Sequence, residues 1–209
     1  MSIAQNPLFT SLRKSFANVT AYSLNGQNII RAKAFNPKNP KTVAQEMNRA
    51  GFKLISDTFQ SFGKYTELGF VERKGNLTAY NVFIAANLPN AIDKTGAEPV
   101  IDYSKLLIAK GSLPPVSVTD CVLNENVITL NYLTKNGLPK VSTTDEIILL
   151  VILKSGAIYV ARQLRGNEFS DSIKLTDRHI NQIDLLCCYI FALSGDGKRA
   201  SNSVYVEIS

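Results

Sequence analysis

The sequence has few of the residues on which metal and catalytic sites depend. Its 209 residues include one histidine, three cysteines and no tryptophan. A single histidine leaves no zinc-ligand spacing, and three cysteines, two of them adjacent at Cys187 and Cys188, do not make a disulfide framework. We therefore expect core thiols in a protein assembled in a reducing compartment, with no metal and no organic cofactor.

Long apolar segments are missing too. No stretch approaches the roughly 20 apolar residues of a membrane span, and residues 1–7 lack the charged-then-apolar pattern of a signal peptide. A hydrophobic content of 45% and a charged content of 19% are ordinary for a chain that buries a core. The expectation is a soluble, unprocessed protein with no membrane contact.

The positive charge lies in the first half of the chain. Residues 1–90 carry 11 Lys and Arg against 4 Asp and Glu, whereas residues 91–209 carry 12 against 13, which together give the net charge of +6. Such a half could meet nucleic acid or an acidic partner, but its cations are spread along the sequence, as on ordinary solvated faces. The candidate basic face consists of Arg31, Lys33, Lys38, Lys41, Arg49 and Lys53.

A hairpin and an extended arm are predicted at the start. Asn25-Gly26 separates two β-prone runs, and this dipeptide is typical of a type I′ hairpin turn. Pro37 and Pro40 then exclude helix and indicate an extended arm. An isolated hairpin is marginal in water, so this one must lean on a helix or reach a neighbouring subunit. The candidate assembly contacts are Tyr22, Asn25, Gly26, Arg31, Pro37 and Pro40.

Two helices should follow as a helical hairpin. Residues 42–45 fit a capping box, which predicts a helix from there to about Gly63. A second helix is expected from residue 76 until Pro89 stops it. The first helix carries apolar residues at spacings of three and four, which predict its core-facing side: Val43, Met47, Ala50, Leu54, Ile55, Thr58, Phe59 and Phe62.

Short β-prone runs occupy the rest of the chain. Their spacing of roughly 8 to 12 residues is typical of an antiparallel sandwich. The runs at 147–153 and 185–193 lack polar alternation, so we expect two central strands of one sheet. The helices of the same chain are the preferred cover for its outer face, and another copy or a partner is the alternative. Strands are predicted at residues 105–109, 116–122, 127–133, 146–153, 157–162, 171–175, 185–193 and 204–208.

The predicted fold class is therefore α+β, with a β-hairpin and a helical hairpin at residues 1–99 and an antiparallel β-sandwich at residues 100–209. The second part resembles a fibronectin type III or immunoglobulin-like module. The lack of tryptophan and of a disulfide pair argues against a true antibody-type domain.

Motifs with a chemical role are nearly absent. His179 follows Asp177 and Arg178 in a polar connection and favours a plain surface histidine. The run Gly195–Lys198 lacks the spacing of a phosphate loop and favours a hairpin turn. Asp145 and Glu146 are adjacent strand residues that point to opposite faces. We expect no enzyme, no catalytic residues and no small-molecule substrate.

Several segments of the sequence carry a resemblance: Tyr22 to Gly26 with Ile30 and Arg31, Asn39 to Gln45 with Arg49 and Phe52, Asn87 to Ile92, Ile101 to Pro114, and Ser201 to Val206. Together they resemble one uncharacterised domain-of-unknown-function family of Bacteroidota bacteria and their phages. The resemblance covers nearly the whole chain and differs in the segment Lys14 to Asn18. It implies a phage-like setting and carries over no catalytic residues.

Three functions from different classes remain open. The first is a structural subunit of a phage virion or phage-like particle, such as a connector, ring, collar or tail component, which binds other copies of itself and other particle proteins. The second is a soluble adhesion or carbohydrate-binding module, and the third a basic nucleic-acid-binding protein. The first places the protein in the virion, assembled in the bacterial host cytoplasm; the alternative is the bacterial cytoplasm itself.

Overall fold

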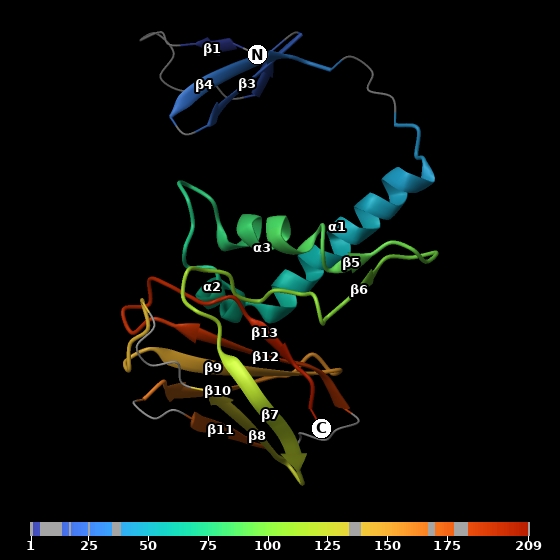
Figure 1. The fold of residues 1–209 in the computed structure, drawn as a ribbon. Coiled ribbons are helices and arrows are strands. Elements are labelled where there is room, and N and C mark those ends of the chain that lie inside the picture. The colour runs from blue at the N-terminus through green and yellow to red at the C-terminus, as the bar shows by residue number, and fades with distance from the viewer. Residues whose placement is uncertain are drawn as a thin grey trace. The chain divides into compact units, whose positions relative to one another are not determined.

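The computed structural model describes residues 2–4, 14–16, 18–24, 26–34, 39–133, 139–166, 170–177 and 184–208 (Figure 1). These residues form helices and antiparallel sheets, with more strand than helix, which confirms the α+β class. The chain divides into two compact units, residues 1–43 and 44–209. The domain boundary expected near residue 100 stays a prediction about independent folding.

The N-terminal unit is a four-stranded antiparallel sheet in the order β1-β4-β3-β2. Its strands are β1 (Ser2–Ala4), β2 (Lys14–Phe16), β3 (Val19–Leu24) and β4 (Gln27–Ala32). Leu24 pairs with Gln27, and Gly26 has a φ of 78°, so the expected hairpin is confirmed. Asn25 lies outside the described residues.

The two flanking strands correct the expectation that this hairpin must lean on a helix or a neighbouring subunit. β1 pairs with β4, and β2 pairs with β3, so the hairpin finds strand partners within its own unit. Each flanking strand has three residues, too few for an alternation of apolar and polar residues to be recognised. The predicted arm falls partly at residues 35–38, outside the described residues.

Three helices follow, one more than the sequence predicts. They are α1 (Val43–Phe62), α2 (Lys64–Gly69) and α3 (Ala79–Asn87). Gly63 ends α1 with a φ of 50°, a left-handed conformation that glycine adopts without steric cost, and the chain continues as the short α2. α3 starts one turn later than expected, where the Thr78 hydroxyl accepts a hydrogen bond of 3.2 Å from the Asn81 amide.

Two further sheets account for most of the remaining chain. One has the order β11-β8-β7 and the other the order β10-β9-β12-β13. β9 and β12 are adjacent and central in the second sheet, as the sequence predicts. The strands are β7 (Ser117–Asn124), β8 (Val127–Leu133), β9 (Glu146–Leu153), β10 (Ile158–Leu164), β11 (Ser170–Thr176), β12 (Leu185–Leu193) and β13 (Val204–Val206).

The strand predicted at residues 105–109 is not formed. Its backbone is held by other segments: the Asn87 side chain accepts from the Leu107 amide and donates to the Leu107 carbonyl, and the Ile108 amide donates to the Ser203 hydroxyl. These bonds replace a sheet ladder. A small pair of strands that the sequence does not indicate, β5 (Ile92–Asp93) and β6 (Val100–Ile101), precedes this segment.

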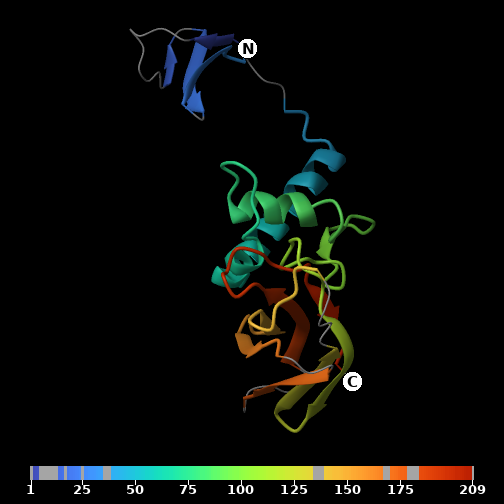
Figure 2. The same cartoon turned by 60° about the vertical axis from the view of Figure 1, so that its left-hand side comes forward.

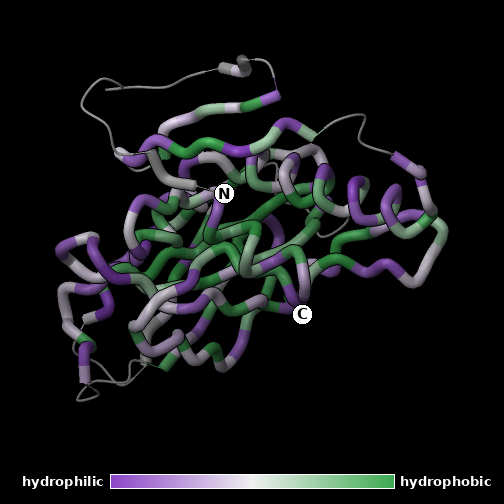
Figure 3. The backbone as a smooth tube through the Cα atoms, turned by 90° about the horizontal axis from the view of Figure 1, so that it is seen from above, coloured by the Kyte–Doolittle hydropathy of each residue, from purple (hydrophilic) through white to green (hydrophobic). Residues whose placement is uncertain are grey.

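Each face of the β9–β12 pair contributes to a separate hydrophobic core. Ile148 and Leu150 of β9 pack in one cluster with the helix residues Ile55, Phe62 and Phe83. The alternate β9 residues pack in a second cluster with residues of β7, β8 and β11. The intrachain helical cover expected for the apolar sheet is thus confirmed. Figure 2 shows the helices on one side of the strands, and Figure 3 shows hydrophobic residues concentrated along the central strands.

Glycines permit close backbone approach between the helices and the loops that follow them. A Cβ at Gly69, the last residue of α2, would overlap the Ile108 carbonyl oxygen, and a Cβ at Gly111 would overlap that of Ala200. The Gly69 carbonyl also accepts a hydrogen bond of 2.9 Å from the Lys110 amide. These contacts fix α2 against the segment that leads into β7.

Glu72 connects three segments of the larger unit. Its carboxylate, on the α2–α3 connection, accepts from the Ser112 amide at 2.7 Å and the Ala200 amide at 3.1 Å. Burial by itself would raise the pKa of Glu72, but the hydrogen bonds from Ser112 and Ala200 outweigh it and hold the pKa below the ordinary value. The charged form is therefore the one that stabilises this junction.

Replacing Ile55 or Phe59 by alanine should lower the free energy of unfolding by about 2–5 kcal/mol. Ile55 is fully buried, and the Phe59 ring lies edge-on to Tyr80 and Phe83 with centroid distances of 5.3 Å to each. Equilibrium urea denaturation measures the loss. Phe52→Ala, at a side chain 44% exposed on the same helix, is the control and should cost less than about 0.5 kcal/mol. An equally small cost for Ile55→Ala would show that this helix face is not core.

Glu72 should make the stability of the larger unit depend on acid pH. Because its pKa is lowered in the folded state, its contribution is present above its unfolded-state pKa and is lost as the pH falls through the folded-state value. Denaturation midpoints measured between pH 7 and pH 3 should fall further for the wild type than for Glu72→Gln. Glu67→Gln, at an exposed position of α2, should follow the wild type. Parallel wild-type and Glu72→Gln curves would contradict the proposed role of this carboxylate.

Candidate functional site

The predicted assembly contacts belong to the N-terminal unit, and the structure brings two of them together. The Arg31 guanidinium carbon lies 5.7 Å from the centroid of the Tyr22 ring, a cation–π distance. Tyr22 on β3 pairs with Ile29, two residues before Arg31 on β4, so both side chains lie on one face. Gly26 occupies the turn and Pro40 an exposed, irregular segment. Asn25 and Pro37 lie outside the described residues.

The predicted basic face is divided between the two units. Arg31 and Lys33 belong to the N-terminal unit, whereas Arg49 and Lys53 lie one turn apart on the exposed side of α1. Lys41 precedes α1 with a φ of 49°, and Lys38 lies outside the described residues. Two aromatic rings of α1, Phe59 and Phe62, pack in the core, whereas Phe52 is 44% exposed. The described cations of the predicted face therefore do not belong to a single unit.

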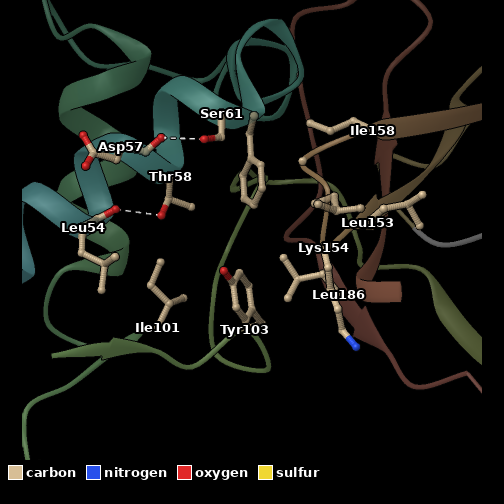
Figure 4. Close-up of a pocket in the computed structure, with 13 residues that line it drawn as sticks. Leu54, Asp57, Thr58, Ser61, Ile101, Tyr103, Leu153, Lys154, Ile158 and Leu186 are labelled. Atoms are coloured by element: carbon tan, nitrogen blue, oxygen red, sulfur yellow. Dashed lines mark hydrogen bonds between the residues drawn. The ribbon is translucent and has the colours of Figure 1, made fainter. Parts of the chain in front are cut away.

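The larger unit contains an open apolar pocket beside the second half of α1 (Figure 4). Its volume is about 250 Å³, and it lies between α1, β6 and the ends of β9, β10 and β12. The lining residues are Leu54, Asp57, Thr58, Ser61, Phe62, Ile101, Tyr103, Ile152, Leu153, Lys154, Gly156, Ile158 and Leu186.

Polar groups of the pocket wall are already engaged or directed outward. The Thr58 hydroxyl donates to the Leu54 carbonyl at 2.8 Å, and the Ser61 hydroxyl donates to the Asp57 carbonyl at 3.0 Å. In Figure 4 the Asp57 carboxylate and the Lys154 amine point away from the centre of the pocket. Burial raises the pKa of Tyr103, so its phenol stays neutral at physiological pH. The pocket therefore suits an apolar side chain.

An apolar stripe on α1 leads into this pocket. Met47, Ala50 and Leu54 follow one another at spacings of three and four residues, and Leu54 itself lines the pocket. Val43, at the start of the helix, extends the stripe and is 79% exposed. Residues at these spacings lie on one side of a helix. The stripe and the pocket together form the candidate site.

This stripe corrects the sequence interpretation of α1. Val43 and Ala50, expected to face the core, are exposed, and the buried residues of the helix all lie between Gly51 and Phe62. At Gly51 the helix meets Ile92 and Pro99, next to the β5–β6 pair. Figures 1 and 2 show the first turns of α1 projecting beyond the other helices. The periodicity of the sequence identified the apolar side of α1. It could not show that other segments bury this side only from Gly51 onward.

A catalytic role for the thiols finds no support in their surroundings. Cys121, Cys187 and Cys188 are free and buried. Burial raises the pKa of Cys187 to about 12, so this thiol is protonated and a poor nucleophile at physiological pH.

His179 lies outside the described residues. Within the part of the chain that the structure describes, no three His, Cys, Asp or Glu side chains are placed to hold a metal ion, and no helix could cross a membrane.

One buried charge pair, Arg165 with Asp145, has a structural role. Arg165 and Asp145 are each about 1% exposed at the side chain and lie 3.6 Å apart, between their nitrogen and oxygen atoms. The Asp145 carboxylate also accepts from the Ser142 amide at 2.9 Å. Burial lowers the pKa of Arg165, and the Asp145 carboxylate opposes this shift. The pair fixes the approach to β9 and the end of β10, and it is remote in sequence from the α1 stripe.

Binding to DNA should be weak and sensitive to salt. Each phosphate that a cation neutralises adds to the salt dependence of affinity, and α1 offers Arg49 and Lys53 as one adjacent pair. Fluorescence anisotropy with a labelled duplex at 50 and 200 mM salt measures the slope. The variant with both cations changed to glutamine should reduce the slope, while Lys110→Gln should not. Nanomolar affinity at physiological salt would place nucleic-acid binding first among the functions.

Comparison with known proteins identifies a family for nearly the whole chain. No curated protein and no solved structure matches it. One family model matches residues 11–207 and carries the description "Family of unknown function (DUF6266)". The match includes β2, β3 and β4 of the N-terminal unit and every helix and strand from α1 to β13. The chain therefore belongs to the DUF6266 family of unknown function.

Proposed function

We propose that the protein is a non-enzymatic structural subunit of a phage virion or phage-like particle, such as a connector, ring, collar or tail component, and that it acts through protein–protein assembly. The exposed apolar stripe of α1 carries this proposal. Val43 is 79% exposed and Ala50 is exposed, while Met47 and Leu54 are half-buried. The buried residues of the helix all lie between Gly51 and Phe62. Apolar side chains aligned on an open helix face are typical of contacts between proteins.

The setting in a phage rests on the resemblance of the chain to a family of Bacteroidota bacteria and their phages. Such a particle would be assembled in the cytoplasm of the bacterial host. A mass-spectrometric inventory of purified particles from the source tests the proposal directly. The protein should be present in stoichiometric amounts with other structural components, and its absence from the particles would contradict the proposed role.

We further infer that the sheets of the larger unit form an immunoglobulin-like sandwich of the fibronectin type III kind. In immunoglobulin constant domains strand B lies between A and E, and strand F lies between C and G. The order β11-β8-β7 corresponds to E-B-A, and the order β9-β12-β13 corresponds to C-F-G. β10 extends the second sheet beside C. The hydrophobic cluster shared by both sheets supports this assignment.

The N-terminal unit gives the subunit a second means of contact. Its four strands form a compact unit separate from residues 44–209, and the intervening residues 39–42 have no regular structure. A contact between this unit and a different surface of the next copy would be head-to-tail, and such contacts close into rings or extend into filaments. We propose that Tyr22, Gly26, Arg31 and Pro40 take part in it, together with Asn25 and Pro37.

Deleting residues 1–40 should abolish rings or filaments while leaving the larger unit folded. The deletion removes the N-terminal sheet but none of the residues of the two hydrophobic clusters. Negative-stain electron microscopy of the full-length and truncated proteins shows the assemblies, and thermal unfolding checks the fold. A truncated protein that still forms rings or filaments would show that the N-terminal unit does not carry the contact.

A further inference from the structure

The α1 stripe has the spacing of a coiled-coil seam. Val43, Met47, Ala50 and Leu54 follow one another at intervals of four, three and four residues, the spacing of alternating d and a positions in a heptad repeat. The side of the helix next to the stripe is packed in the larger unit through Gly51, Ile55, Thr58 and Phe62. The stripe lies beside this packed side, with Val43 and Ala50 exposed and Met47 and Leu54 half-buried.

Two opposite charges border the stripe along its solvent side. Glu46 and Lys53 occupy the g positions of the same heptads, and both side chains are exposed. In an antiparallel coiled coil the g positions of the two helices lie opposite each other. A helix with an acidic residue at one g position and a basic residue at the next is thus complementary to a second copy of itself.

From this pattern we propose that α1 of one copy packs antiparallel against α1 of a second copy, about a two-fold axis between residues 48 and 49. The layers of the contact are Val43 with Leu54 of the other copy, and Met47 with Ala50 of the other copy, each formed twice. Glu46 of each copy then faces Lys53 of the other. This inference deepens the proposed assembly function and rests on it for its biological setting.

The pocket beside α1 favours the antiparallel direction. Leu54 lines the pocket, so the antiparallel arrangement brings the exposed Val43 of one copy to the pocket mouth of the other. A parallel pairing would place Glu46 and Lys53 opposite Gly51 and Thr58, which carry no charge, and would leave both pockets open. Alanine at position 50 leaves room for the longer Met47 of the other copy.

Charge reversal tests the pairing on the full-length chain. Glu46→Lys or Lys53→Glu replaces two attractive contacts of the symmetric dimer by two repulsive ones, which should raise the dimer dissociation constant about ten-fold. Mixing the two variants restores both contacts in a heterodimer, so the mixture should dimerise at concentrations at which each variant alone is mainly monomeric. Sedimentation velocity over a concentration series measures this. Lys74→Glu, the same charge change on the exposed α2–α3 connection, is the matched control and should behave as the wild type.

Cross-linking tests the contact independently of any assembly through the N-terminal unit. A zero-length carbodiimide, applied to an equal mixture of ¹⁵N-labelled and unlabelled wild-type protein, should yield a peptide pair in which Glu46 of one isotope is joined to Lys53 of the other. Circular dichroism of each variant verifies that it is folded. This cross-link and recovery of dimers in the mixture would together establish the contact.

The outcomes separate this inference from the proposed particle role. Single reversals that sediment as the wild type, or a variant mixture that stays monomeric, would overturn the α1 contact even if the protein is found in particles. If the inter-isotope cross-link forms but purified particles lack the protein, the contact stands and the particle role fails. A dimer that is lost on deletion of residues 1–40 but not on charge reversal would overturn the contact as well.

Discussion

The requirement that both faces of the β9–β12 strand pair be buried determines the arrangement of the larger unit. Every residue from Ile147 to Leu153 and from Cys187 to Leu193 is buried. Since successive strand residues point to opposite faces, the pair needs two separate covers. The sheet of β7, β8 and β11 provides one, and the helices with the 102–113 segment provide the other. The strand pair is therefore fully buried only when both the helices and the second sheet pack against it.

The segments between the helices and the strands are held by specific polar and steric contacts because they have no ladder of their own. Glu72 binds two backbone amides, and the Asn87 side chain binds both backbone groups of Leu107. Gly69 and Gly111 let backbones approach where any Cβ would collide. These contacts allow a buried connection to satisfy its backbone groups without regular structure.

The sequence predicted the helices and strands that are specified by neighbouring residues. It missed those that depend on contacts with residues distant in the sequence. The limits of α1, β8, β9 and β12 follow from caps, breakers and apolar runs, and the Asn25-Gly26 turn was found from two residues. The strand predicted at 105–109 failed because Asn87 and Ser203, distant in sequence, compete for its backbone. β1, β2, β5 and β6 are too short to produce a pattern. The pocket could not be predicted, because its walls come from segments more than 100 residues apart.

The exposure of the α1 stripe follows from a difference in length between the helix and its support. A helix of 20 residues is about 30 Å long, whereas the buried span from Gly51 to Phe62 accounts for about 18 Å. The remaining turns extend beyond the packed helices, yet they keep the apolar spacing of the buried part. An overhang with no further role could carry polar residues there at no cost to the core. Val43, Met47 and Ala50 on that overhang, together with Glu46 and Lys53, instead make up the self-complementary surface that we propose.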